Sequence, residues 1–171
     1  ATDVDGIAFT GSSTVGWELV ATRSPSGLPR PVLAEMGGQN AAIVTRTANL
    51  DDAATGIARS AYGLSGQKCS ACRRVVVDNA VADELIERLA VKAQALVVGD
   101  PSDSASNLGP VIDDAIGARI DSALALAARD GRVVAGGRLE REGNWFAPVL
   151  VADLPRGHEL DRKSTRLNSS H

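Results

Sequence analysis

Apolar residues recur along the chain with two different spacings, and segments of the two kinds alternate. Short apolar runs bounded by glycine, proline or polar residues predict buried strands at residues 4–9, 32–36, 41–44, 74–77, 132–135 and 148–151. Longer segments with apolar positions three or four residues apart predict amphipathic helices at residues 13–20, 50–64, 80–97 and 112–124. This alternation of strands and helices predicts an α/β fold with a parallel sheet.

The first predicted strand runs into a Gly/Ser turn at the start of a helix, with Ser12 or Ser13 as the N-cap. Such a turn exposes unpaired backbone N–H groups and a partial positive charge, which suit a phosphate group. Capped strand–helix turns are also common without any ligand, and residues 11–16 do not follow the Gly-x-Gly-x-x-Gly pattern. The turn by itself leaves both interpretations open.

Glu35 stands at the end of the second predicted strand, directly before Gly37 and Gly38. An ionised carboxylate is costly to bury, so Glu35 either faces solvent on an edge strand or serves a chemical purpose such as general-base catalysis. The two glycines let the backbone pass close to a ligand beside that carboxylate. They therefore favour the functional interpretation.

Cys69 follows a Gly-Gln-Lys turn and precedes small residues, within the segment YGLSGQKCSACRR at residues 62–74. Lys68, Arg73 and Arg74 add positive charge nearby, which favours the nucleophilic thiolate form of a cysteine. Cys69 is therefore the candidate nucleophile. The alternative is that it is an ordinary small residue buried in the core.

The second cysteine, Cys72, creates a Cys-x-x-Cys spacing that also occurs in zinc sites and redox pairs. A structural zinc site needs four ligands, but the sequence has only His158 and His171 and no second cysteine pair. The rest of the chain does not resemble a small thioredoxin-like domain. We therefore expect no metal, and a packing role for Cys72.

Composition narrows the classes of partner. The chain has 171 residues, 44% of them apolar, and a formal charge of −3. This acidity argues against a nucleic-acid surface, and no apolar run approaches the roughly 20 residues of a membrane span. The first residues do not form a signal peptide. With both thiols expected to be reduced, a cytoplasmic location is predicted.

Three separated motifs agree with one family. They are FTGSSTVG at residues 9–16, AEMGGQN at 34–40 and GQKCSACRR at 66–74. In this order and at these separations they resemble the aldehyde dehydrogenase superfamily, from about residue 4 to residue 160. The second and third motifs are most similar to the members that act on 1-pyrroline-5-carboxylate, or L-glutamate γ-semialdehyde, in proline metabolism.

The resemblance implies an NAD-dependent oxidoreductase that converts an aldehyde to a carboxylate. Cys69 would be the catalytic nucleophile, Glu35 the base that activates the deacylating water, and Ser70 a contact of the substrate carboxylate. It places the cofactor at Thr10, Gly11, Ser12, Met36, Gly37 and Glu159. Ser12 would contact a phosphate, Thr10 and Gly11 the nicotinamide region, and Glu159 the nicotinamide ribose.

The resemblance also implies a domain organisation. Residues 1–36 would be the end of a Rossmann-like cofactor domain, and residues 37–160 most of an α/β catalytic domain that carries the thiol. Residues 161–171 match nothing in the family and are expected to form a non-native, disordered tail. The chain would then be an internal fragment of a homo-oligomeric enzyme, inactive alone.

Two alternatives remain open at this level. The first is a related dehydrogenase for another small aldehyde, such as succinate semialdehyde. The second is a truncated module without catalytic activity. The sequence alone does not separate them, because the family's oxyanion asparagine and its lysine for the adenosine ribose lie outside the matched stretch.

Overall fold

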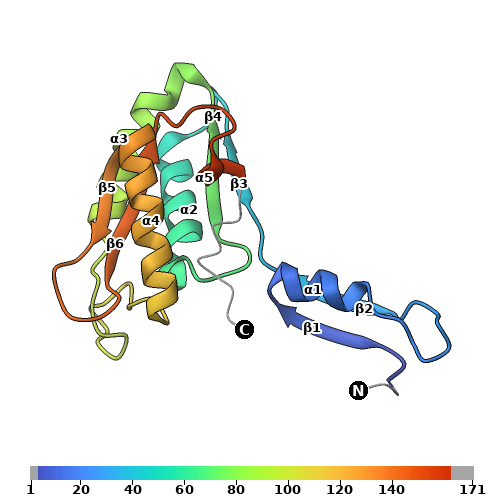
Figure 1. Ribbon diagram of the computed structural model, residues 1–171. Coiled ribbons are helices and arrows are strands. Elements are labelled where there is room, and N and C mark those ends of the chain that lie inside the picture. The colour runs from blue at the N-terminus through green and yellow to red at the C-terminus, as the bar shows by residue number, and fades with distance from the viewer. Residues whose placement is uncertain (1–3, 163–171) are drawn as a thin grey trace.

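The computed structural model describes residues 4–162 and shows three two-stranded sheets with helices packed on them (Figure 1). In chain order the elements are β1 (Ile7–Gly11), α1 (Ser13–Val20), β2 (Val32–Met36), β3 (Asn40–Val44), α2 (Leu50–Tyr62), the 3₁₀ helix η1 (Gly63–Gly66), β4 (Cys72–Val77), the 3₁₀ helix η2 (Asn79–Val81), α3 (Ala82–Gln94), α4 (Asp114–Asp130), β5 (Arg132–Arg138), β6 (Phe146–Ala152) and α5 (Glu159–Arg162). The α/β class is as predicted.

The first three elements form a β–α–β unit that lies apart from the other elements in Figure 1. Strands β1 and β2 are parallel, as predicted for strands joined through a helix. Helix α1 covers one face of the pair and packs closely against it at Gly16, where a Cβ would come within 2.5 Å of Met36 Sδ. The glycine therefore lets the helix approach the end of β2.

The central core forms where α2 and α3 pack against the parallel pair β3–β4. Its buried members are Val44, Ala54, Ile57, Leu85 and Leu89. Val44 comes from β3 and the others from one face of each helix, while Ala42, Val75 and Val77 of the strands pack against them at alternate positions. The two apolar spacings in the sequence therefore meet here. This core supports the segment between α2 and β4, which carries Cys69.

The last two strands depart from the predicted parallel sheet. Strands β5 and β6 pair antiparallel as a hairpin. The connection between them is too short for the crossover that parallel strands need. Helix α4 packs on this hairpin, with Ile116, Ile120 and Phe146 in a second buried cluster. The expected start of the helix at Ile112 is wrong, because Asp113 caps it and Ile112 is 70% exposed.

Helix α2 ends two residues earlier than predicted, at Tyr62. The Tyr62 hydroxyl donates to the Val149 carbonyl oxygen at 3.1 Å, and burial raises the pKa of Tyr62 to about 12. This hydrogen bond fixes the last turn of α2 to β6. The chain therefore leaves the helix from a fixed point.

The division into a cofactor domain at residues 1–36 and a catalytic domain at residues 37–160 stays a prediction. Of the expected tail, Asp161 and Arg162 fall within α5, and residues 163–171 lie outside the described residues. Every helix found in residues 4–162 is too short or too polar to cross a lipid bilayer.

Candidate active site

The segment between α2 and β4, called the thiol loop below (residues 63–71), begins with an unusual backbone. Leu64, Ser65 and Gly66 have φ angles of 53°, 54° and 71°. For residues other than glycine this left-handed region costs about 1–3 kcal/mol each and persists only where the surroundings impose it. The loop must therefore be held in place by other parts of the fold.

Side-chain hydrogen bonds hold the loop on two sides. Ser65 Oγ donates to the Gly109 carbonyl at 2.9 Å, and Gln67 Oε1 accepts from the Ile112 amide at 3.1 Å. From β4, Arg73 Nη2 donates to the Gly66 carbonyl at 3.0 Å. Burial lowers the pKa of the Arg73 guanidinium below its ordinary value. The strained turn is thus fixed to the segment before α4 and to β4.

Cys69 lies at the exposed tip of this loop. The Ala71 amide donates to the Lys68 carbonyl at 3.2 Å, which closes a turn with Cys69 and Ser70 at its centre. Ala71 is 1% exposed and anchors the turn, while Cys69 and Ser70 face outward. Cys69 is therefore not a buried core residue, and its thiol is open to a substrate.

Cys72 has a different environment. It is half-buried in β4, its Sγ donates to the Arg74 carbonyl at 3.3 Å, and its amide donates to Ser60 Oγ at 3.3 Å. It packs against the central core, in keeping with the expected packing role. Within residues 4–162 no group of three His, Cys, Asp or Glu side chains is placed to hold a metal ion.

This contrast predicts which thiol reacts first. Iodoacetamide at neutral pH should label Cys69 well before Cys72, because only Cys69 is exposed while Cys72 is packed and hydrogen-bonded. Peptide mass spectrometry of a time course would measure both rates. Preferential labelling of Cys72 would contradict the assignment of Cys69 as the reactive thiol, and labelling in denaturant serves as the control for intrinsic reactivity.

The motif that contains Glu35 meets the thiol loop through its last residues. Asn40 Nδ2 donates to the Cys69 carbonyl at 2.6 Å and to the Ala71 carbonyl at 3.3 Å. A Cβ at Gly38 would lie 3.4 Å from the Cys69 oxygen. Glu35 itself is exposed at the end of β2. The expected role of Glu35 as the base that activates the deacylating water stays a prediction.

The predicted cofactor residues of β1 and β2 come together with Glu35. In the parallel register Thr10 pairs with Glu35, and Gly11 pairs with Met36. These are the last residues of the two strands, and Gly37 follows directly. In α/β proteins, ligands bind at the carboxyl ends of parallel strands. Their roles in cofactor binding stay predictions.

The start of α1 has features that favour a bound anion. Ser12 is the N-cap, and its hydroxyl accepts from the Val15 amide at 3.2 Å. The first turn of the helix contains no acidic residue that would repel an anion. Because the first amides of a helix have no partner within the helix and the helix dipole is positive at this end, the start of α1 favours an anion such as a phosphate group.

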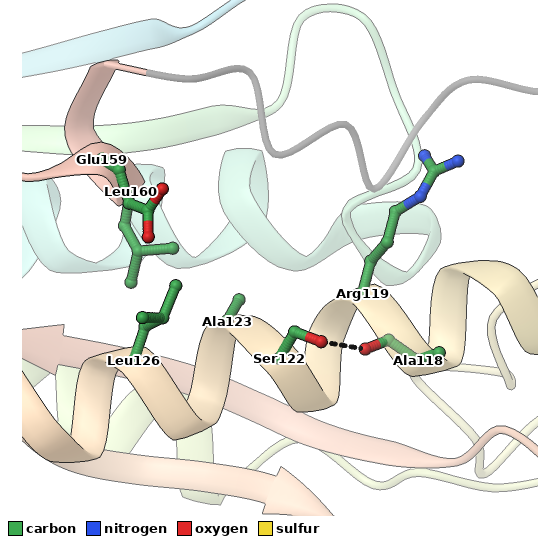
Figure 2. Close-up of a pocket in the computed structure, with 7 residues that line it drawn as sticks. All are labelled: Ala118, Arg119, Ser122, Ala123, Leu126, Glu159 and Leu160. Carbon is green, nitrogen blue, oxygen red and sulfur yellow. Dashed lines mark hydrogen bonds between the residues drawn. The ribbon is translucent and has the colours of Figure 1, made fainter.

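Glu159 lies elsewhere, on α5. It lines a pocket of about 280 Å³ together with Leu160 and one face of α4 (Figure 2). The lining is mostly apolar side chains of α4, including Ala123 and Leu126. The pocket lining contains none of the other predicted cofactor or catalytic residues.

Sequence reasoning missed the residues that hold the thiol loop, namely Ser65, Gln67 and Asn40. Gln67 and Asn40 stand inside the motifs GQKC and AEMGGQN, so a signal was present. Arg73 was recognised only as a nearby positive charge. Lys68 Nζ lies next to Gly63, and a Cβ on this glycine would lie 3.3 Å from the Lys68 nitrogen.

The sequence model described as the aldehyde dehydrogenase family matches residues 1–165. The chain belongs to the aldehyde dehydrogenase family. Among curated members, 1-pyrroline-5-carboxylate dehydrogenase of Bacillus cytotoxicus is 40% identical over 159 residues, covering 90% of this chain and 31% of the relative. The enzyme of that name from Bacillus thuringiensis is 39% identical, with the same coverage. The chain thus spans about a third of the length of the curated relatives it matches.

Solved structures of aldehyde dehydrogenases share the fold. A Thermus 1-pyrroline-5-carboxylate dehydrogenase with bound NAD superposes with a TM-score of 0.87 at 32% identity, covering 96% of this chain and 33% of that one. Betaine aldehyde dehydrogenase from Staphylococcus aureus gives a TM-score of 0.86 at 23% identity over 96% of this chain and 33% of that one. The aldehyde-dehydrogenase-like α/β fold predicted from the sequence is confirmed. The aldehyde dehydrogenase family is a family of oxidoreductases.

Proposed function

We propose that this chain is the thiol-bearing part of an NAD-dependent dehydrogenase that oxidises L-glutamate γ-semialdehyde to glutamate. The observation that carries the proposal is the exposed Cys69 on a braced, strained loop, joined through Asn40 to the motif that contains Glu35. The match to relatives named 1-pyrroline-5-carboxylate dehydrogenase supports the choice of substrate.

In the proposed reaction the Cys69 thiolate adds to the aldehyde carbon and forms a thiohemiacetal. The cofactor supplies a hydride acceptor, which allows the thiohemiacetal carbon to be oxidised to a thioester. Glu35 then takes a proton from a water molecule, which attacks the thioester and releases the carboxylate and the free thiol. The backbone N–H of Cys69 would stabilise the negative oxygen in the addition steps.

The residues at the ends of β1 and β2 are those proposed to hold the cofactor. Ser12 and the start of α1 fit its phosphates, while Thr10 and Gly11 adjoin Glu35 and Met36 in the sheet register. Gly37 continues this edge toward the thiol loop. Glu159 is proposed to contact the nicotinamide ribose, a role that requires α5 and β1–β2 to share one cofactor site.

Fewer residues of this chain support the choice of substrate than support the thiol chemistry. Ser70 follows Cys69 at the exposed tip of the loop, and we assign it to the substrate carboxylate. A dehydrogenase for another small aldehyde, such as succinate semialdehyde, would use the same thiol and base. Comparing kcat/KM for the two semialdehydes would distinguish these enzymes.

We further propose that the chain is an internal part of a longer cytoplasmic homo-oligomer, called the full-length protein below. The 171-residue chain covers about a third of the length of its relatives, and the family resemblance implies that the oxyanion asparagine lies outside it. Losing one oxyanion donor costs on the order of 100- to 1,000-fold in rate. The chain alone should also form only half of the dinucleotide site.

An NADH absorbance assay on both proteins tests the proposed function. The full-length protein should reduce NAD when given glutamate semialdehyde, and the 171-residue chain should show no measurable turnover. A full-length protein that oxidises no aldehyde would overturn the function and leave the non-catalytic alternative. Robust turnover by the 171-residue chain would show that the chemistry needs fewer residues than proposed.

A further inference from the structure

We propose that Asn40 is a positioning residue for the Cys69 nucleophile. The inference builds on the proposed function and adds a role that the family resemblance did not assign. Its starting point is that one exposed side chain bonds two backbone carbonyls of the same turn, at 2.6 Å for Cys69 and 3.3 Å for Ala71. These two carbonyls lie on either side of Ser70, so Asn40 ties together the tip of the thiol loop.

A register shift places Asn40 where it can do this. Asn40 pairs with Cys72, whereas the next residue, Ala41, pairs with Arg74, so Arg73 is an extra residue in β4. Irregularities of this kind re-aim side chains and often lie beside active sites. Here Arg73 donates to the Gly66 carbonyl, and Asn40 donates to the Cys69 and Ala71 carbonyls.

Gly38 leaves the space that this arrangement needs. A Cβ at Gly38 would lie 3.1 Å from Asn40 Oδ1, 3.3 Å from Asn40 Nδ2 and 3.4 Å from the Cys69 oxygen. Contacts of this kind with the Asn40 amide are tighter than ordinary van der Waals contacts. The glycine therefore allows the asparagine to lie between its own strand and the loop.

The consequence is a fixed direction for the peptide groups around Cys69. The Asn40 side chain donates to the Cys69 carbonyl, and the Ala71 amide donates to the Lys68 carbonyl. The peptide groups before and after Cys69 are therefore both held by hydrogen bonds. The position of the thiol relative to its own amide depends on this backbone. A misplacement of about 1 Å at a reacting group can cost roughly 100-fold in rate.

Three variants separate positioning from packing. Asn40→Ala removes the amide, and Asn40→Asp keeps its size and shape but replaces the donor with a carboxylate facing two carbonyl oxygens. The matched control is Asn49→Ala, which removes the N-cap of α2, where Asn49 Oδ1 accepts from the Asp51 and Asp52 amides. Asn49 lies at the other end of α2 from the thiol loop.

The first measurement is amide hydrogen exchange of the 171-residue chain, read by mass spectrometry. Asn40→Ala should speed exchange of the Ala71 and Cys72 amides on the order of 10-fold, as loss of a hydrogen bond releases the turn. Asn40→Asp should speed it at least as much. Asn49→Ala should speed exchange only at the start of α2. An Asn40→Asp loop that exchanges like the wild type, or a loop equally loosened by Asn49→Ala, overturns the proposal.

The second measurement uses the full-length protein. Asn40→Ala and Asn40→Asp should lower kcat on the order of 10- to 100-fold while leaving the KM for NAD unchanged. Asn49→Ala should leave kcat unchanged. A rise in KM with unchanged kcat overturns the positioning role. A wild-type protein that oxidises no aldehyde overturns the proposed function instead, and hydrogen exchange still decides the role of Asn40.

Discussion

Replacing Cys69 with alanine in the full-length protein is expected to lower kcat for aldehyde oxidation by roughly 10⁴-fold or more, as when other enzymes lose their nucleophile. The reason is that no thiohemiacetal can form without this thiol, and the other cysteine is half-buried and bonded to the Arg74 carbonyl. Cys69 is exposed, so its replacement by alanine should leave the fold intact. Stopped-flow and steady-state NADH formation would measure the loss.

Cys72→Ala is the matched control, because it removes the neighbouring thiol from the same loop-to-strand region. It should retain kcat within an order of magnitude and lower stability modestly, since Cys72 packs against the central core. A Cys72→Ala protein that loses activity while Cys69→Ala keeps it would reverse the two roles.

Replacing Glu35 with glutamine is expected to lower steady-state kcat by about 100- to 10,000-fold, the usual contribution of a general base. Glutamine has the same size as glutamate and stays exposed at the end of β2, so the fold should not change. The proposed role affects only hydrolysis of the thioester. Thioester formation should therefore continue, giving a burst of NADH close to one per active subunit followed by slow turnover.

Burst kinetics distinguish a role of Glu35 in thioester hydrolysis from a role in an earlier step. Intact-protein mass spectrometry should show the acylated Cys69 during the slow phase. Glu18→Gln is the control, because Glu18 is an exposed carboxylate on α1 next to the same strands. It should behave like the wild type. Loss of the burst together with loss of turnover in Glu35→Gln would mean that Glu35 acts before the thioester forms, contrary to the proposal.

Much of the local structure could be predicted from the sequence. Ser12 caps α1 as expected, and β2 has the predicted bounds. These features depend on residues within a few positions of one another. Caps and apolar periodicity act over a single turn or strand, so a one-dimensional pattern contains the information. The motifs around Glu35 and Cys69 identified the family for the same reason, since each is a short contiguous stretch.

The end of α2 and the sheet arrangement depended on distant partners. The positive φ angles at Leu64 and Ser65 are held by hydrogen bonds to residues more than forty positions away, such as Gly109. Burial of the hairpin against α3 and α4 accompanies antiparallel pairing of the last two strands. The helix or strand propensity of a short segment contains no information about such long-range contacts. Where propensity and tertiary packing favour different structures, tertiary packing prevails.

The sequence by itself determined the family and the order of the strands β1–β6 and of the helices α1–α4. Only the tertiary structure decided how the two central motifs meet, because Asn40 and Cys69 are 29 positions apart and their contact depends on a one-residue shift in β3–β4 pairing. It also placed Glu159 in a separate pocket against α4. The physical reason is that strand register and helix docking are set by burial summed over many residues, whereas a motif records only its own neighbours.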